Sequence, residues 1–299
     1  MKKIKFLLTS LFVLLSFIAP AMAQEVNIGL YVLNLGKFDI STGSFTADFY
    51  ISMKCSQTCP QETFEFMNGR AGTIDKVINK PNEKFYRIQA NLNSPVDLKR
   101  FPFDTQKMQI IIEDKNNDIK ELQYTSLEDE SGIDESIIFS GWNIDGWSAE
   151  VKKHNYAVYN ETFSQYVFNI EISRIVLNSF MKTFLPVIFI LLIVLLSLIL
   201  DPDKMPTRLT MAGSSLVAAV MFHVSISNQI PPVGYLTFAD KFMILTYFIL
   251  LLVFLIDIIL IEFLELKKTK LVEKIHRSTE YSMLIAVPLL YILLFVFFT

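Results

Sequence analysis

Hydroxyl and amide side chains recur at helical spacing inside an apolar segment, residues 206–230. At about 100° of rotation per residue, six positions of this segment fall within about 40° of one line. They are Thr210, Ser214, Val217, Met221, Val224 and Asn228. Hydroxyl groups can coordinate a partly dehydrated ion, and a ring of apolar side chains can exclude water. The pattern is typical of a helix that lines a pore, although a Ser/Thr face can also pack one membrane helix against another.

The composition indicates an integral membrane protein. The 299 residues are 52% hydrophobic and 13% aromatic, with a mean hydropathy of +0.40. Residues 1–23 combine Lys2, Lys3 and Lys5 with an apolar run and a small-residue end, which predicts a secretory signal peptide. An uncleaved membrane anchor is the alternative. The net charge of −3 does not indicate a nucleic-acid partner.

Four apolar segments predict four membrane-spanning helices within a transmembrane domain, residues 179–299. Their expected bounds are about 180–200, 207–230, 238–263 and 281–299. Basic residues are dense between positions 267 and 277, and Lys204 and Arg208 lie in the other loop on the same side. Both loops are therefore expected in the cytoplasm. The N-terminal domain and the C-terminus would be extracytoplasmic, as in a multi-pass protein of the cell inner membrane.

Residues 24–178 have a different character, because strand-like runs of alternating polarity are separated by Gly, Asn, Asp and Pro. At least seven such runs recur, which predicts an exported all-β sandwich. Cys55 and Cys59 lie in this region. An exported context favours a disulfide between them over a metal site, which two cysteines without nearby histidines would form poorly.

Several short motifs occur in a characteristic order along the chain. They are Phe101-Pro102-Phe103-Asp104-Thr105-Gln106, Ser140-Gly141-Trp142-Asn143-Ile144, Ile172-Ser173-Arg174, Leu185-Pro186 and Gln229-Ile230-Pro231. Together they resemble the pentameric ligand-gated ion channel, or Cys-loop receptor, superfamily, in a prokaryotic type with a shortened extracellular domain. The resemblance implies an immunoglobulin-like extracellular β-sandwich followed by a four-helix transmembrane bundle. It also implies a homopentamer in which the second helix of each subunit lines the pore.

The same resemblance assigns a gating role to the junction of the two domains. It implies that Asp104, Asp39 and Arg174 form an ionic cluster, and that Phe101, Pro102 and Phe103 lie in the loop that contacts the linker starting at Pro231. Pro186 either kinks the first span or is simply tolerated there. Asp257 lies inside the third span, where it is expected to face protein or a water-filled crevice.

Ion selectivity and the ligand are less strongly indicated. The run of Pro206, Thr207 and Arg208 resembles the Pro-Ala-Arg of anion-selective relatives, which favours anions, whereas Asp203 could form an acidic ring. The resemblance implies a hairpin that caps the ligand site, and in this chain that hairpin offers three aromatic residues, Tyr156, Tyr159 and Phe163. The alternative is that these three are ordinary strand-surface and core aromatics. The agonist is expected to be a small molecule or a proton. The proton is a candidate because the domain is rich in carboxylates and the chain has histidines at 154, 223 and 276.

The sequence therefore predicts a ligand-gated ion channel subunit whose partners are its own copies, permeant inorganic ions and membrane lipids. No enzyme motif, cofactor motif or metal-ligand cluster competes with this hypothesis. The alternative is a non-conducting membrane sensor or assembly protein on the same scaffold. A transporter is not favoured, because neither inverted repeats nor interrupted helices are visible in the sequence.

Overall fold

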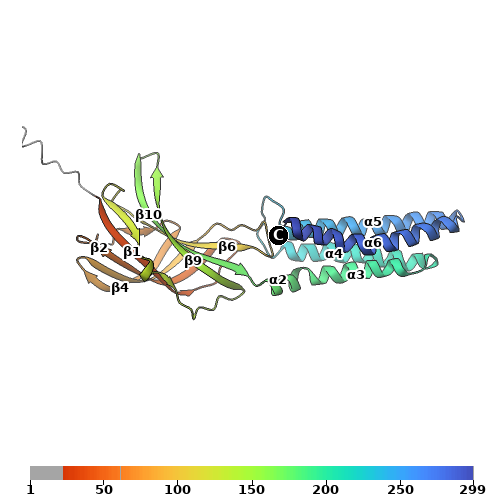
Figure 1. The fold of residues 1–299 in the computed structure, drawn as a ribbon, viewed down its shortest axis with the longest axis horizontal. Helices are drawn as coiled ribbons and strands as arrows, with labels where there is room; N and C mark the ends of the chain where they lie inside the picture. Colours follow the sequence, from red (N-terminus) through yellow and green to blue (C-terminus); the bar gives the residue numbers. More distant parts are fainter. Residues whose placement is uncertain (1–22, 61, 299) are drawn as a thin grey trace, which may run out of the picture.

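The computed structural model describes residues 23–60 and 62–298, so the expected signal peptide lies outside the described residues except for its last position. The strands come first along the chain and the helices second, and the two parts lie end to end (Figure 1).

Within the described residues, ten strands form two sheets. One sheet has the order β4-β5-β2-β1-β7, and β8 also pairs with β1, further along that strand than β7 does. The other sheet has the order β3-β6-β10-β9. The strands of the first sheet are β1 (Gln24–Leu35), β2 (Ser44–Cys55), β4 (Gly69–Lys80), β5 (Glu83–Asn93), β7 (Leu122–Ser126) and β8 (Gly132–Ile133). Those of the second are β3 (Phe64–Phe66), β6 (Thr105–Asp114), β9 (Trp142–Tyr156) and β10 (Glu161–Arg174). All pairings are antiparallel except those of β1 with β7 and β8.

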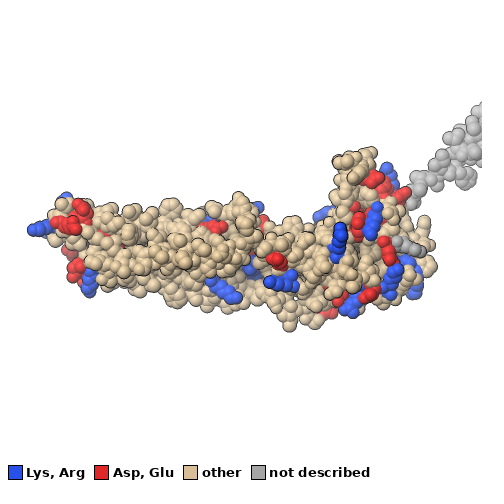
Figure 2. All heavy atoms as spheres, turned by 180° about the vertical axis from the view of Figure 1, so that it is seen from behind, with Lys and Arg blue, Asp and Glu red and all other residues tan. Residues whose placement is uncertain are grey.

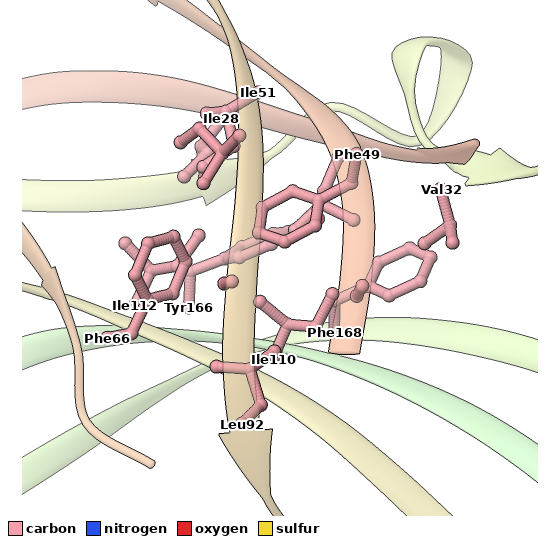
Figure 3. Close-up of a cluster of buried hydrophobic side chains, with 14 of the residues drawn as sticks. Ile28, Val32, Phe49, Ile51, Phe66, Leu92, Ile110, Ile112, Tyr166 and Phe168 are labelled. Atoms are coloured by element: carbon pink, nitrogen blue, oxygen red, sulfur yellow. The ribbon is translucent and has the colours of Figure 1, made fainter. Parts of the chain in front are cut away.

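The two sheets enclose one hydrophobic core. Alternate side chains of β2, β5 and β6 are buried, as the period of a strand requires. Phe49, Ile51 and Leu92 from the first sheet meet Ile110 and Phe168 from the second (Figure 3). The strands and this shared core agree with a β-sandwich, whereas the finer immunoglobulin-like topology stays a prediction.

The predicted disulfide is present between Cys55 and Cys59. Both cysteines are buried against the core, and the bond closes the short loop that follows β2.

In the described part of the chain, five α-helices follow the strands. They are α2 (Val176–Thr183), α3 (Leu185–Ile199), α4 (Met205–Ser227), α5 (Phe238–Glu265) and α6 (Thr269–Phe298), with short 3-10 turns η2 (Glu128–Glu130) and η3 (Pro202–Lys204). Three of the described helices are long and apolar enough to cross a membrane, and α2 with α3 supplies a fourth if the pair is one span. These two helices meet at a bend of 42°, immediately before Pro186.

The last helix begins at Thr269, twelve residues before the expected start at 281, because its polar first turns continue the same helix. Charged side chains gather over the strands and at the far end of the helices, leaving an almost uncharged stretch between (Figure 2). Such a band matches the hydrocarbon layer, and the chain is an integral membrane protein.

Candidate functional site

Helix α4 presents two contrasting faces. Its buried face comprises Met205, Arg208, Ala212, Ser215, Ala219 and Ile226. All six residues of the predicted pore stripe are exposed in the single subunit. The exposed fractions of Val217, Met221 and Val224 are 64%, 66% and 53%. The other helices of the subunit therefore leave this stripe uncovered, free to face water or further subunits.

The N-terminal end of α4 corrects one expectation from the sequence. Pro206 and Asp203 are exposed there, but Arg208 is fully buried. Its Nη2 donates to Oδ1 of Asp257 on α5 at 2.6 Å, and Asp257 is fully buried as well. Arg208 therefore does not present its charge on the exposed face. A guanidinium among apolar helices is stabilised by a carboxylate, and this pair supplies the partner of Asp257 that the sequence did not reveal.

The junction between strands and helices is built around Asp104. Arg174, the last residue of β10, donates from Nε to Oδ1 of this buried carboxylate at 2.6 Å. Gln106 donates to the other carboxylate oxygen at 2.7 Å. The guanidinium of Arg174 also lies 5.0 Å from the ring centroid of Phe101 and 4.6 Å from that of Trp142.

Asp39 is not part of this cluster. Its carboxylate accepts the backbone N–H of Ser41 at 2.8 Å within an exposed turn, and this bond lowers the pKa of Asp39. No ion pair joins Asp39 to Arg174 among the described residues. The expected triad is therefore a pair supported by two aromatic rings, because the local turn already uses the Asp39 carboxylate.

The loop that contains Pro102 bonds directly to the helical part. The backbone N–H groups of Phe238 and Ala239 donate to the carbonyls of Lys99 and Phe101, at 2.9 and 3.0 Å. Leu98 N–H donates to the hydroxyl of Tyr235 at 2.9 Å, in the linker that half-buried Pro231 begins.

Aromatic packing reinforces these bonds. The ring of Phe103 stacks on Phe184 with centroids 5.5 Å apart and lies 6.0 Å from Phe238. The loop is thus packed against α5 and against the bend between α2 and α3.

The β9–β10 hairpin projects from the body of the strands (Figure 1). Tyr156 packs its ring edge against Phe163 at 5.6 Å, whereas Tyr159 is 71% exposed at the hairpin tip. The structure therefore brings together two of the three candidate ligand aromatics. Burial and the nearby Glu113 carboxylate raise the pKa of Tyr156 to about 12, so its hydroxyl stays protonated.

Sequence reasoning missed the carboxylate beneath this hairpin. Glu113 on β6 is buried, and it accepts from Tyr156 at 3.0 Å and from Gln165 at 3.1 Å, with His154 Nδ1 at 2.9 Å. A second missed contact joins His223 of α4 to Tyr247 and Asp240 of α5, at 2.8 and 3.1 Å. Both sets combine residues distant in sequence. The sequence singled out His154 and His223 as titratable groups, but gave no signal of the carboxylates that they meet.

No protein-family model matches the chain. Among curated proteins, the chain is 24% identical over 257 residues to the proton-gated ion channel of Gloeobacter violaceus, covering 76% of this chain and 71% of that one. It is 26% identical to the pH-sensitive chloride channel 2 of Drosophila melanogaster, over 54% of this chain. It is 23% identical to the serotonin-gated chloride channel mod-1 of Caenorhabditis elegans, over 53% of this chain. The last two alignments span about a third of each relative, 33% and 32%.

All three of these relatives are ion channels, and none is an enzyme. They confirm the resemblance that the motifs indicated: the chain is a relative of the pentameric ligand-gated ion channels, the Cys-loop receptor superfamily.

Proposed function

We propose that this chain is a ligand-gated ion channel subunit, five copies of which surround a pore lined by α4. The observation that carries the proposal is the two-faced burial of this helix. Its predicted stripe is exposed, whereas the opposite face packs within the subunit. Rings of Val217, Met221 and Val224 would form an apolar gate, with Thr210 and Ser214 nearer the end that begins at Met205.

In this proposal residues 24–178 form an extracytoplasmic ligand-binding domain after a signal peptide at 1–23, and residues 179–299 form the transmembrane domain. The Asp104–Arg174 pair braces the strand end of the junction. Phe238 and Ala239 donate hydrogen bonds to the Pro102 loop, and the loop residue Leu98 donates one to Tyr235, so that end is connected to α5 and to the linker after α4. A displacement of the strands would therefore reach the pore helix through this linker.

Protons are the stimulus that the comparisons favour. One relative is named as proton-gated and another as pH-sensitive, whereas the third is named as serotonin-gated. Two relatives are named as chloride channels, which supports the proposal that anions permeate. The exposed residue Pro206 also places no carboxylate at the expected inner mouth.

The test is current across a planar bilayer that contains the purified chain, under a KCl gradient. The pH on the extracytoplasmic side is stepped from about 8 to 4, across the His and carboxylate range. Discrete openings on acidification support a proton-activated channel, and the reversal potential identifies the permeant ion. Silence over the whole range rejects proton activation and favours the non-conducting scaffold or an unknown small-molecule agonist.

A further inference from the structure

Three buried ionisable side chains join α4, α5 and α6, away from the junction with the strands. Arg208 and Asp257 have no exposed surface, and His276 of α6 is 8% exposed. Arg208 Nη2 bonds to Asp257, and Arg208 Nη1 lies 3.0 Å from Nδ1 of His276. The gating path proposed above does not use this cluster.

Hydrogen-bond chemistry fixes the protonation state of His276 in this arrangement. A guanidinium can only donate, so Nδ1 of His276 must accept, and the ring must be neutral with its proton on Nε2. A protonated ring donates from both nitrogens. It would also place two cations 3.0 Å apart, when the single carboxylate of Asp257 is already paired with Arg208. Protonation of His276 and the Arg208–His276 hydrogen bond therefore exclude each other.

The cluster has a second arrangement available. Oδ2 of Asp257 is buried and has no hydrogen-bond partner among the described residues. Once His276 is protonated, Nη1 of Arg208 retains the carbonyl of Leu200 at 3.4 Å and can turn toward this free oxygen. The change would separate α6 from the start of α4 while keeping Arg208 paired with Asp257.

Protons can reach the ring from one side. His276 lines a cavity of about 440 Å³ at this end of the helices, together with Asp201 beside η3 and with Glu273, Arg277 and Glu280 of its own helix. The charged groups that face the ring are therefore Arg208 from α4, Asp257 from α5, and these four. Three carboxylates at the cavity concentrate protons near the ring.

We propose that His276 is a regulatory proton-binding site on the cytoplasmic side of the channel, and that its protonation releases the inner end of α4 from α6. This site is separate from the extracytoplasmic stimulus, and it rests on the proposed channel function and orientation. The proton moves from water in the cavity to Nδ1, and the hydrogen bond from Arg208 is the only bond lost at the ring.

The chain has three histidines, so each can be tested by one substitution. The experiment holds the extracytoplasmic side at an activating pH and steps the cytoplasmic side from pH 8 to 6. We expect the open probability of the wild type to change about fivefold or more, the range of typical allosteric coupling. His276→Gln keeps an acceptor oxygen but cannot be protonated, so this variant should lose the response. Lys270→Gln, a substitution of an exposed side chain near the start of the same helix, should retain it. An undiminished response in His276→Gln overturns the proposal.

A second measurement separates this proposal from the channel function. If no variant conducts, the proposed function fails, and thermal unfolding of the helices by circular dichroism then decides the question. A midpoint that falls between pH 8 and 6 in the wild type but not in His276→Gln supports the site, whereas an equal fall in both rejects it. His276→Asn, whose amide oxygen is also a neutral acceptor, serves if the Gln variant does not fold.

Discussion

At the scale of single residues, the Asp104 carboxylate is the best-supported feature of the junction. It is 1% exposed and accepts hydrogen bonds from Arg174 and Gln106. Loss of one partner of a buried ion pair leaves a charge without compensation, which typically costs about 3 to 5 kcal/mol. We therefore expect Arg174→Ala to abolish activation or assembly, as measured by current and by the yield of folded protein.

Asp39→Ala is the matched control for that variant, because it also removes a charge near the same junction. Its carboxylate bonds within its own turn, to Ser41 and Thr42, so activation and yield should change little. If both variants lose activation and yield equally, the result would support the three-membered cluster implied by the family resemblance.

The buried Arg208–Asp257 pair gives a second prediction. Asp257→Ala leaves the guanidinium buried without its carboxylate, and the free energy of unfolding should fall by about 3 to 5 kcal/mol. Replacing both residues by apolar ones, Arg208→Met with Asp257→Leu, should recover most of that loss, because no buried charge remains. Chemical unfolding in detergent measures both. A double variant as unstable as the single one would show that the pair contributes more than mutual neutralisation.

The sequence predicted that Asp257 faces protein or a water-filled crevice, but not which residue it pairs with. Opposite charges in separate apolar segments are expected to pair. The family resemblance, however, places Arg208 at the mouth of the pore, and its neighbour at position 207 is indeed exposed. Which face of α4 turns inward depends on packing against α3 and α5. That choice depends on the whole set of buried side chains and cannot be read from a single residue.

At the scale of elements, the exposed stripe of α4 predicts where the channel closes. Val217→Ser should let water into the apolar ring and increase the basal current, as dewetting gates require. Val220→Ser is the matched control, since Val220 is 45% exposed on the same helix but lies about 80° from the centre line of the stripe, outside it. Equal leak in both variants, or in neither, would argue that this stripe does not form the gate.

The elements themselves were largely predictable. Period-two alternation marked β2, β5 and β6, and hydropathy located the cores of the long helices. Hydropathy missed the first twelve residues of α6, because an amphipathic, charged turn forms a helix as readily as an apolar one. It also could not decide between the two outcomes for Pro186, which depended on whether the helix breaks before it.

At the scale of the whole molecule, acid should destabilise the strands only at low pH. Hydrogen bonds from Lys54, Ser136 and Lys152 hold the pKa values of Glu130, Asp134 and Glu150 below their usual values. Such groups stabilise the fold above their unfolded pKa values, near 4, and that stability is lost as the pH falls through the folded values.

Both tryptophans, Trp142 and Trp147, lie in β9, so their fluorescence follows the strands alone. We expect the thermal midpoint by fluorescence to hold from pH 7 to 5 and to fall below about pH 4. A large fall already at pH 5 would mean that currents evoked by mild acid accompany unfolding of the exported domain.

Selectivity is a property of the assembled mouth, and burial of Arg208 changes which residues can set it. The exposed positions there are Pro206, Thr207 and Asp203.

Pro206→Glu in five copies would add a ring of carboxylates beside Thr210, whose hydroxyl donates to the Pro206 carbonyl at 2.8 Å. We expect the ratio of chloride to potassium permeability to fall about tenfold or more, a difference of about 1.4 kcal/mol. Thr207→Glu, one position round the helix, should change the ratio less. The same reversal-potential measurement is made on the wild type, and a wild type that reverses at the potassium potential would reject anion permeation. An unchanged permeability ratio in Pro206→Glu would show that residue 206 does not line the ion path.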